Sequence, residues 1–225
     1  MHPRLTGLNH REALLYLGCK GGTITPDIEA DIARCETLLL QTARPRIVWR
    51  RFPLLPDGSL SGTDFRPQGE DVKTLLHGCE AVILFAATLG AEAEALIRRA
   101  QVTDMAKAVL LDACASAAIE NVCDNLCDDF AAAEAPLYLT DRFSPGYGDL
   151  PLHTQPALLR MLDADRTLGI TATAQHILLP QKSVTAVLGC SHSPVQDARK
   201  GICGVNCKGC PHEDTCPSRC GTAEN

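Results

Sequence analysis

Apolar residues recur along the chain at spacings that predict both helices and strands. Between Thr25 and about Leu40 they fall at positions 28, 32, 35 and 39, which predicts an amphipathic helix. Thr25 followed by Pro26 suits the N-cap and first turn of that helix. The stretch from Thr103 or Asp104 to about Phe130 is rich in Ala and Leu and almost free of Gly and Pro. It is predicted to form the longest helix.

Shorter runs predict the remaining elements. Residues 46–52, 81–87 and 137–140 have the composition of strands, and residues 9–17, 91–101 and 155–162 that of helices. The β-prone runs 171–179 and 183–188 flank a Pro-Gln-Lys turn and predict an antiparallel hairpin. Helices and strands mix without strict βαβ alternation. The expected fold class is therefore α+β, a mixed, partly antiparallel sheet with several helices.

The composition changes sharply after Gly189, where Gly, Cys, Pro and charged residues replace the aliphatic pattern. The 225 residues suit one compact domain with a short appendage. The predicted division is a domain over residues 1–189 and an irregular Cys-rich tail over residues 190–225.

Charge and hydropathy narrow the classes of partner. The net charge is −6 and the basic residues do not cluster, which argues against nucleic acid because phosphate binding needs a basic face. No apolar stretch has the length of a signal peptide or a transmembrane helix. A cytoplasmic protein without a membrane partner is expected.

The twelve cysteines form two groups. Six are scattered among apolar residues and are expected to pack as small hydrophobic side chains: Cys19, Cys35, Cys79, Cys114, Cys123 and Cys127. Cys190 stands alone upstream of five that crowd the tail: Cys203, Cys207, Cys210, Cys216 and Cys220. Because cytosolic thiols are usually reduced, a metal or redox site is favoured over disulfides.

Four of the tail thiolates would complete a zinc tetrahedron or hold an iron–sulfur cluster. A [4Fe–4S] cluster that relays an electron, structural zinc, and a redox-labile thiol cluster all remain open. Cys190, His192 and His212 are competing ligands.

The segment Arg142-Phe-Ser-Pro-Gly-Tyr-Gly-Asp-Leu-Pro151 is the strongest candidate for ligand binding. It follows a predicted strand, and its glycines and prolines define a compact backbone path. Arg142 offers a bidentate fork for a carboxylate, and Tyr147 offers a flat face and a hydroxyl. The alternative is a structural arginine that holds the loop or pairs with a carboxylate such as Asp149.

This loop and the segments after it occur in one order and at close spacing, ending in Leu-Pro-Gln-Lys-Ser-Val-Thr-Ala-Val-Leu-Gly at 179–189. Together they resemble the activation domain of cobalamin-dependent methionine synthase, especially its short stand-alone relatives. The segments at 11–18, 86–90 and 111–120 fit those relatives too. The tail departs from that domain.

The resemblance implies binding of S-adenosylmethionine by an R-x-x-x-G-Y loop, which falls here on Arg142, Gly146 and Tyr147, with backbone contacts that include Pro145. Glu120 matches an acidic residue on the preceding long helix. Asp112, Ser116 and Glu120 also share one helix face, so this face is either a solvated polar stripe or turned toward the ligand. A carboxylate there would suit the ligand's ammonium, sulfonium or ribose hydroxyls.

The implied role is to reactivate a separate corrinoid methyltransferase, with methionine synthase as the first candidate. Reactivation would proceed by reductive methylation of cob(II)alamin and would need an electron donor. The chain lacks the D-x-H-x-x-G segment that supplies a cobalt-ligating histidine, so it is expected to be a component of a methyltransferase system. Two alternatives stay open. One is an iron–sulfur or zinc redox or regulatory module that does not use S-adenosylmethionine, and the other is an activator of a different corrinoid methyltransferase. Residues 182–185 form either a contact surface for the partner or an ordinary hairpin turn.

Overall fold

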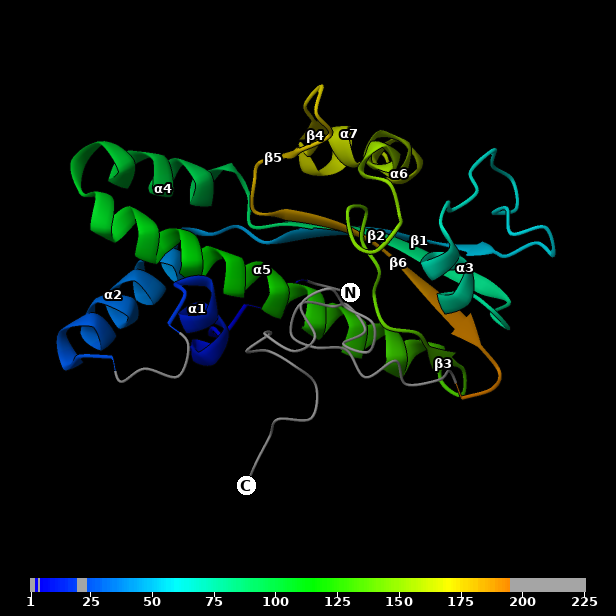
Figure 1. The fold of residues 1–225 in the computed structure, drawn as a ribbon, viewed down its shortest axis with the longest axis horizontal. Helices are drawn as coiled ribbons and strands as arrows, with labels where there is room; N and C mark the ends of the chain where they lie inside the picture. Colours follow the sequence, from blue (N-terminus) through cyan, green and yellow to red (C-terminus); the bar gives the residue numbers. More distant parts are fainter. Residues whose placement is uncertain (1–2, 4, 20–23, 195–225) are drawn as a thin grey trace. The chain divides into compact units, whose positions relative to one another are not determined.

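The computed structural model describes residue 3, residues 5–19 and residues 24–194 (Figure 1). These residues fall into two compact units. The first unit is drawn from residues 1–48, 86–129 and 159–184, and the second from residues 49–85, 130–158 and 185–225. The chain passes between the units within several of its helices and strands.

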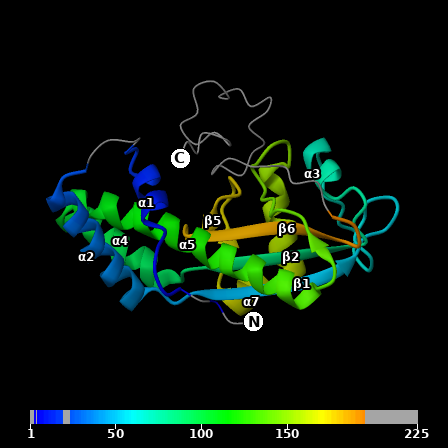
Figure 2. The same cartoon turned by 90° about the horizontal axis from the view of Figure 1, so that it is seen from below.

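Four helices make up most of the first unit. They are α1 (His10–Tyr16), α2 (Pro26–Thr42), α4 (Ala91–Thr103) and the N-terminal part of α5 (Met105–Glu134). Both ribbon views show α1, α2 and α4 beside this part of α5 (Figures 1 and 2).

Side-chain caps begin three of these helices. Asn9 accepts a hydrogen bond from the Glu12 amide (3.2 Å), and Thr25 accepts one from the Ile28 amide (3.4 Å). Asp104 accepts one from the Lys107 amide (3.0 Å), which identifies the cap of α5. Each carboxylate, amide or hydroxyl oxygen satisfies an amide that has no partner within its helix. The predicted N-termini of α1, α2 and α5 are confirmed.

The second unit is organised by a four-stranded sheet in the order β1 (Arg46–Pro53), β2 (Ala81–Thr88), β6 (Ser183–Ser191), β3 (Tyr138–Leu139). Figure 2 shows β1, β2 and β6 as successive strands. The Leu54 amide donates to the Glu80 carbonyl (2.8 Å), and the Glu80 amide donates to the Cys190 carbonyl (2.9 Å). β3 pairs antiparallel with β6, with Leu139 opposite Cys190. Because β6 continues to Ser191, this strand includes the first two residues of the predicted tail.

Strand β2 is the most buried element of the fold. All eight of its residues are buried, as are the last seven residues of β6. In the second unit, Phe130 on α5 packs against Phe85 of β2 (ring centroids 6.2 Å apart) and edge-on against Trp49 of β1 (5.2 Å). These three rings form an aromatic centre, in which Phe85 and Phe130 are buried and Trp49 is 37% exposed. Phe143 is a further buried ring in a core that is mainly aliphatic.

The hairpin predicted across residues 171–188 is wrong. A separate two-stranded sheet joins β4 (Thr171–Ala172) to β5 (Leu178–Leu179), whereas β6 lies in the main sheet. Thr173 causes the early reversal, because its hydroxyl accepts hydrogen bonds from the Gln175 and Ile177 amides (3.3 and 3.2 Å). The turn also places His176 at a positive φ of 64°.

The short helical elements lie in the connections. α6 (Gln155–Leu162) has the predicted bounds and follows the 3-10 turn η1 (Leu152–Thr154). α3 (Glu70–Leu75) and α7 (Ala164–Leu168) are not predicted from the sequence, because helices of five or six residues show too little periodicity. The predicted α+β class is confirmed. Among the described helices, none combines the length and apolar character needed to cross a membrane.

Replacing Phe130 with alanine tests the aromatic centre of the second unit. Phe130 is 1% exposed, so removing its ring should lower the free energy of unfolding by about 3–5 kcal/mol. Chemical denaturation would measure the loss, with Tyr138→Ala as the control at an aromatic residue that is 47% exposed. Equal, small losses in both variants would contradict a packed aromatic core.

Candidate functional site

The loop that begins at Arg142 is anchored on β6 at its start. The Thr140 amide donates to the Gly189 carbonyl (2.9 Å), and the Gly189 amide donates to the Thr140 hydroxyl (2.8 Å). Phe143 then exchanges two backbone hydrogen bonds with Val187 (2.9 and 2.8 Å). Arg142 lies between these two anchors and is half-buried. Its backbone position is therefore set by the central sheet.

Beyond Phe143 the backbone folds on itself. The Tyr147 amide donates to the Ser144 carbonyl (3.0 Å), and the Leu150 amide donates to the Tyr147 carbonyl (3.1 Å). The Gly146 amide closes the loop on the Leu150 carbonyl (2.9 Å). Gly146 has a φ of +94°, a conformation that residues with a Cβ rarely adopt.

The exposed part of the loop carries the groups expected to contact a ligand. Gly146 and Tyr147 are exposed, and the Tyr147 side chain is 43% accessible. Pro145 is buried. The structure thus brings Arg142, Pro145, Gly146 and Tyr147 together in one anchored loop.

The far end of the loop is attached to α3. The Asp149 carboxylate accepts hydrogen bonds from the backbone amides of Glu70 (2.6 Å) and Asp71 (3.1 Å). The sequence alone suggested Asp149 as a partner for Arg142. Its role on α3 joins segments about 80 residues apart, a contact that no local sequence signal reveals.

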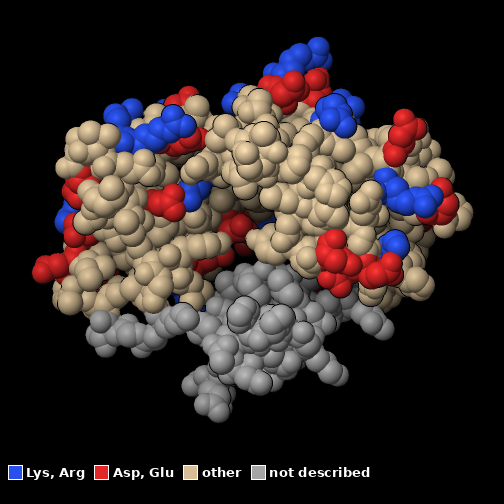
Figure 3. Space-filling model, turned by 45° about the horizontal axis from the view of Figure 1, so that its top comes forward, with Lys and Arg blue, Asp and Glu red and all other residues tan. Residues whose placement is uncertain are grey.

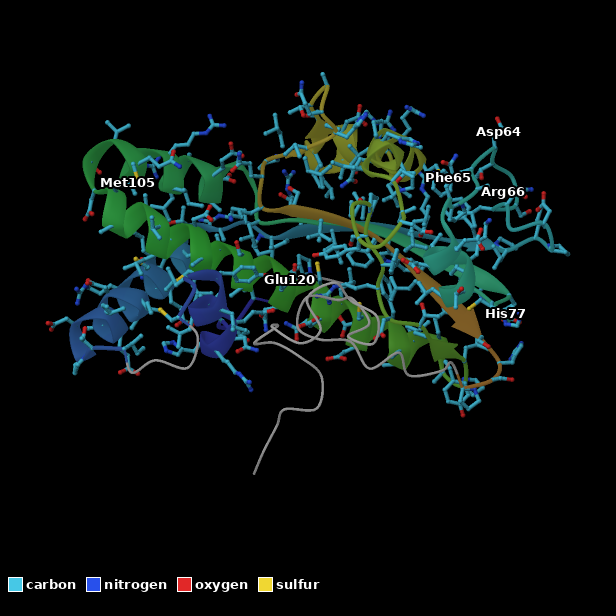
Figure 4. All side chains as sticks on the ribbon, in the orientation of Figure 1. Asp64, Phe65, Arg66, His77, Met105 and Glu120 are labelled. Carbon is cyan, nitrogen blue, oxygen red and sulfur yellow. The ribbon has the colours of Figure 1, made fainter. Side chains whose placement is uncertain are left out.

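Glu120 belongs to the first unit, on the polar face of α5 (Figure 4). Asp112, Ser116 and Glu120 are exposed or half-buried, whereas Ala113, Ala117 and the other small residues around them are buried. The helix therefore has the polar face predicted from the i, i+4 spacing. Glu120 belongs to the first unit and the Arg142 loop to the second.

Lys182, just before β6, contacts this polar face of α5. Its ammonium lies 2.9 Å from the Asp112 carboxylate and donates to the Ser116 hydroxyl (2.8 Å). The Lys182 side chain is only 13% exposed, so most of its length is covered. Its carbonyl also accepts from the Leu89 amide (3.0 Å), which joins the beginning of β6 to the end of β2.

The next residues of that segment also make internal contacts. Ser183 donates to the buried Thr88 hydroxyl (2.8 Å), which in turn accepts from the Gly90 amide (3.1 Å). In the second unit, Thr185 donates to the Gln155 side-chain oxygen. These hydrogen bonds stabilise the first residues of β6, Ser183 in the first unit and Thr185 in the second.

Among the described cysteines, Cys35, Cys114, Cys123 and Cys190 are buried, and Cys19, Cys79 and Cys127 are half-buried. All seven carry free thiols. Burial raises the pKa of Cys79 to about 11 and that of Cys114 to about 12, and it also raises the pKa values of Cys35 and Cys190. At these four positions burial favours the neutral thiol over the thiolate.

The residues described in the structure contain no group of three His, Cys, Asp or Glu side chains arranged to hold a metal. The five predicted ligands, Cys203, Cys207, Cys210, Cys216 and Cys220, lie outside the described residues. The metal site stays a prediction from the sequence.

The second unit also contains a cleft of about 610 Å³ beside α3, lined by Leu54, Arg66, Lys73, His77 and their neighbours. Figure 4 labels Arg66 and His77 in this region. None of the predicted site residues that the structure describes lines the cleft. Its two strong cations are already paired, Arg66 with Asp57 (2.5 Å) and Lys73 with Glu70 (2.6 Å), so the cleft has no marked excess of positive charge.

Acidic and basic side chains are interspersed on the one face that Figure 3 draws. On the face drawn in Figure 3, Lys and Arg lie in small groups close to Asp and Glu. This distribution agrees with the scattered basic residues in the sequence.

No family model matches the chain, and no curated protein matches it in sequence. The fold is nevertheless similar to that of a solved domain. It is similar to the crystal structure of the MetH reactivation domain bound to AdoHcy, with a TM-score of 0.54 and 15% sequence identity over 85% of this chain and 81% of that one. The predicted resemblance is confirmed at the level of the fold.

Replacing Lys182 with methionine tests the polar contact on α5. The variant keeps most of the buried hydrocarbon but removes the charge. Because Asp112 is 52% exposed and can be rehydrated, we expect a loss of about 1–2 kcal/mol in the free energy of unfolding. A double-mutant cycle with Asp112→Asn should give a coupling energy of about 0.5–1 kcal/mol. Lys73→Met, at an exposed pair, is the control, and a coupling energy of zero would contradict the assigned contact.

Proposed function

We propose that the chain binds S-adenosylmethionine and serves as a reactivation subunit for a separate cobalamin-dependent methyltransferase, methionine synthase being the first candidate. The observation that carries the proposal is the agreement of two features. The fold is similar to that of a reactivation domain bound to AdoHcy, and an R-x-x-x-G-Y loop is anchored on the central sheet of this fold.

The charges of the candidate residues suit the ligand. S-adenosylmethionine carries a carboxylate, an ammonium and a sulfonium. The Arg142 guanidinium matches the carboxylate, because planar N–H groups bind carboxylates in bidentate fashion. Glu120 matches the cationic groups or the ribose hydroxyls. The exposed backbone at Gly146 and Tyr147 and the buried Pro145 before them offer peptide groups for the adenosyl and amino-acid ends.

By binding S-adenosylmethionine, this protein would support the repair of the partner's cofactor. One electron reduces cob(II)alamin to the cob(I) state, whose cobalt displaces S-adenosylhomocysteine from the sulfonium methyl group and leaves methylcobalamin. This protein would contribute binding and orientation of the methyl donor. No general acid or base is needed. An external electron donor and the corrinoid protein complete the system.

The alternative proposal is a metal-binding redox or regulatory module that does not use S-adenosylmethionine. Five cysteines within residues 203–220 favour it. The two proposals differ in one observable, because this alternative requires metal binding without affinity for S-adenosylmethionine. The partner could also be a corrinoid methyltransferase other than methionine synthase. Reconstitution with purified corrinoid proteins of each type would identify it, because only the partner should form methylcobalamin.

Calorimetric titration with S-adenosylmethionine tests the loop assignment. We expect binding by the anaerobically purified protein, and Arg142→Ala should lose about 1.5–3 kcal/mol of binding free energy because a charged hydrogen-bonding partner is removed. Arg160→Ala is the matched control, since Arg160 is an exposed arginine on α6. Absence of binding by the wild-type protein would contradict the proposal that this chain alone forms the site.

Metal analysis after anaerobic purification tests the tail. If the cysteines hold a [4Fe–4S] cluster that relays the electron, about four iron atoms and four sulfides per chain are expected, with a brown colour that dithionite bleaches. A variant with Cys207 and Cys210 replaced by serine should lose the metal. A Cys79→Ser variant is the control, because its pKa of about 11 keeps that thiol protonated. A colourless protein with one zinc ion would exclude the electron relay.

A further inference from the structure

The first turn of α3 receives its cap from the candidate ligand-binding loop. The amides of Glu70 and Asp71 have no partners within the helix, and both donate to the Asp149 carboxylate (2.6 and 3.1 Å). The residue at the N-cap position is Gly69, which has no side chain to supply the cap. Hydrogen bonds from backbone amides to a carboxylate are about twice as strong as those between neutral groups. The loop and α3 are thus joined by a strong, specific contact.

Glycines on both sides make this contact sterically accessible. At Gly69, which has a φ of +113°, a Cβ would collide with the Asp149 carboxylate and lie 2.9 Å from its carbonyl oxygen. At Gly148, with a φ of +49°, a Cβ would collide with the Asp71 carboxylate and lie 3.0 Å from the Phe143 ring. Each side of the contact therefore requires a residue without a side chain.

The exposed part of the loop lies between two fixed points. Phe143 holds one end on β6, and Asp149 holds the other on α3. Gly146 and Tyr147, which are exposed, lie between them. A loop held at both ends in its binding conformation loses less conformational entropy when a ligand binds, so its affinity is higher than that of a loop free at one end.

We propose that Asp149 is a positioning residue for S-adenosylmethionine: its contact with the first turn of α3 holds the Arg142–Tyr147 segment in the conformation that binds. The inference rests on the proposed function. It adds that a part of the chain remote in sequence, Gly69 to Asp71, determines affinity without contacting the ligand.

Two variants disturb the contact from opposite sides. Asp149→Ala removes the carboxylate, and Gly69→Ala obstructs it from the α3 side without changing the loop. Both should raise the dissociation constant for S-adenosylmethionine about tenfold in calorimetric titration. Asp149→Asn keeps one acceptor oxygen and a good capping group, so it should restore affinity to within about threefold of wild type.

Gly78→Ala is the matched control. Gly78 also has a positive φ, +77°, but a Cβ there would meet nothing within 4 Å. It therefore places a Cβ at a positive φ without the collision, and its affinity should equal that of wild type. Thermal unfolding of every variant establishes which are folded. Folded Asp149→Ala and Gly69→Ala variants with wild-type affinity would overturn the proposal.

Hydrogen exchange gives a second readout that needs no ligand. The Gly146 and Leu150 amides are hydrogen-bonded within the loop, and their protection should fall in Asp149→Ala and Gly69→Ala but not in Gly78→Ala. If wild type does not bind S-adenosylmethionine, the proposed function fails, whereas loss of protection would still support the loop anchor. Unchanged protection in both variants would show that Asp149 does not position the loop.

Discussion

The burial of strand β2 is the constraint on which the rest of the structure depends. From Ala81 to Thr88 every residue is buried, so each of its backbone amides and carbonyls needs a partner within the protein. β6 lies on one side of it and β1 on the other. β6 is itself buried along most of its length, which leaves its second edge to β3 and to the beginning of the candidate loop. The most buried part of the chain therefore positions the part expected to bind a ligand.

This arrangement explains how a fold can be shared at 15% identity. The sheet needs apolar residues and paired backbone groups, and many sequences satisfy both requirements. Ligand binding needs particular groups in particular places, so site residues have to be argued one by one. In this chain the loop is held by backbone hydrogen bonds to β6 and by the Asp149 carboxylate, which accepts hydrogen bonds from the first amides of α3. The exposed Gly146 and Tyr147 lie between those attachments.

The two groups of cysteines illustrate how position changes the chemistry of one residue type. Cys79, Cys114 and Cys190 lie in covered positions where the neutral thiol is favoured. Such side chains contribute packing, and their reactivity at neutral pH is low. The five tail cysteines are close in sequence, with Gly and Pro among them, which is the pattern of a metal site. The metal remains a prediction, and the proposed electron relay depends on it.

Local patterns in the sequence determined most of the elements. The caps at Asn9, Thr25 and Asp104 act over three residues, and the apolar runs of β2 and α5 reflect burial along a single element. The loop from Arg142 was identified because its glycines, prolines and arginine are contiguous. Its role in binding S-adenosylmethionine came from resemblance and is still to be tested.

Only the tertiary structure decided which distant segments meet. The hairpin predicted around Pro180 failed because Thr173 turns the chain early and β6 has a more buried place in the main sheet. Lys182 contacts Asp112, which lies 70 positions earlier in the chain. Asp149 contacts α3, which lies about 80 positions earlier. No periodicity carries such information, because it arises when separate elements pack together. The sequence by itself thus determined the elements and the candidate loop, and the packing of those elements decided what holds the loop in place.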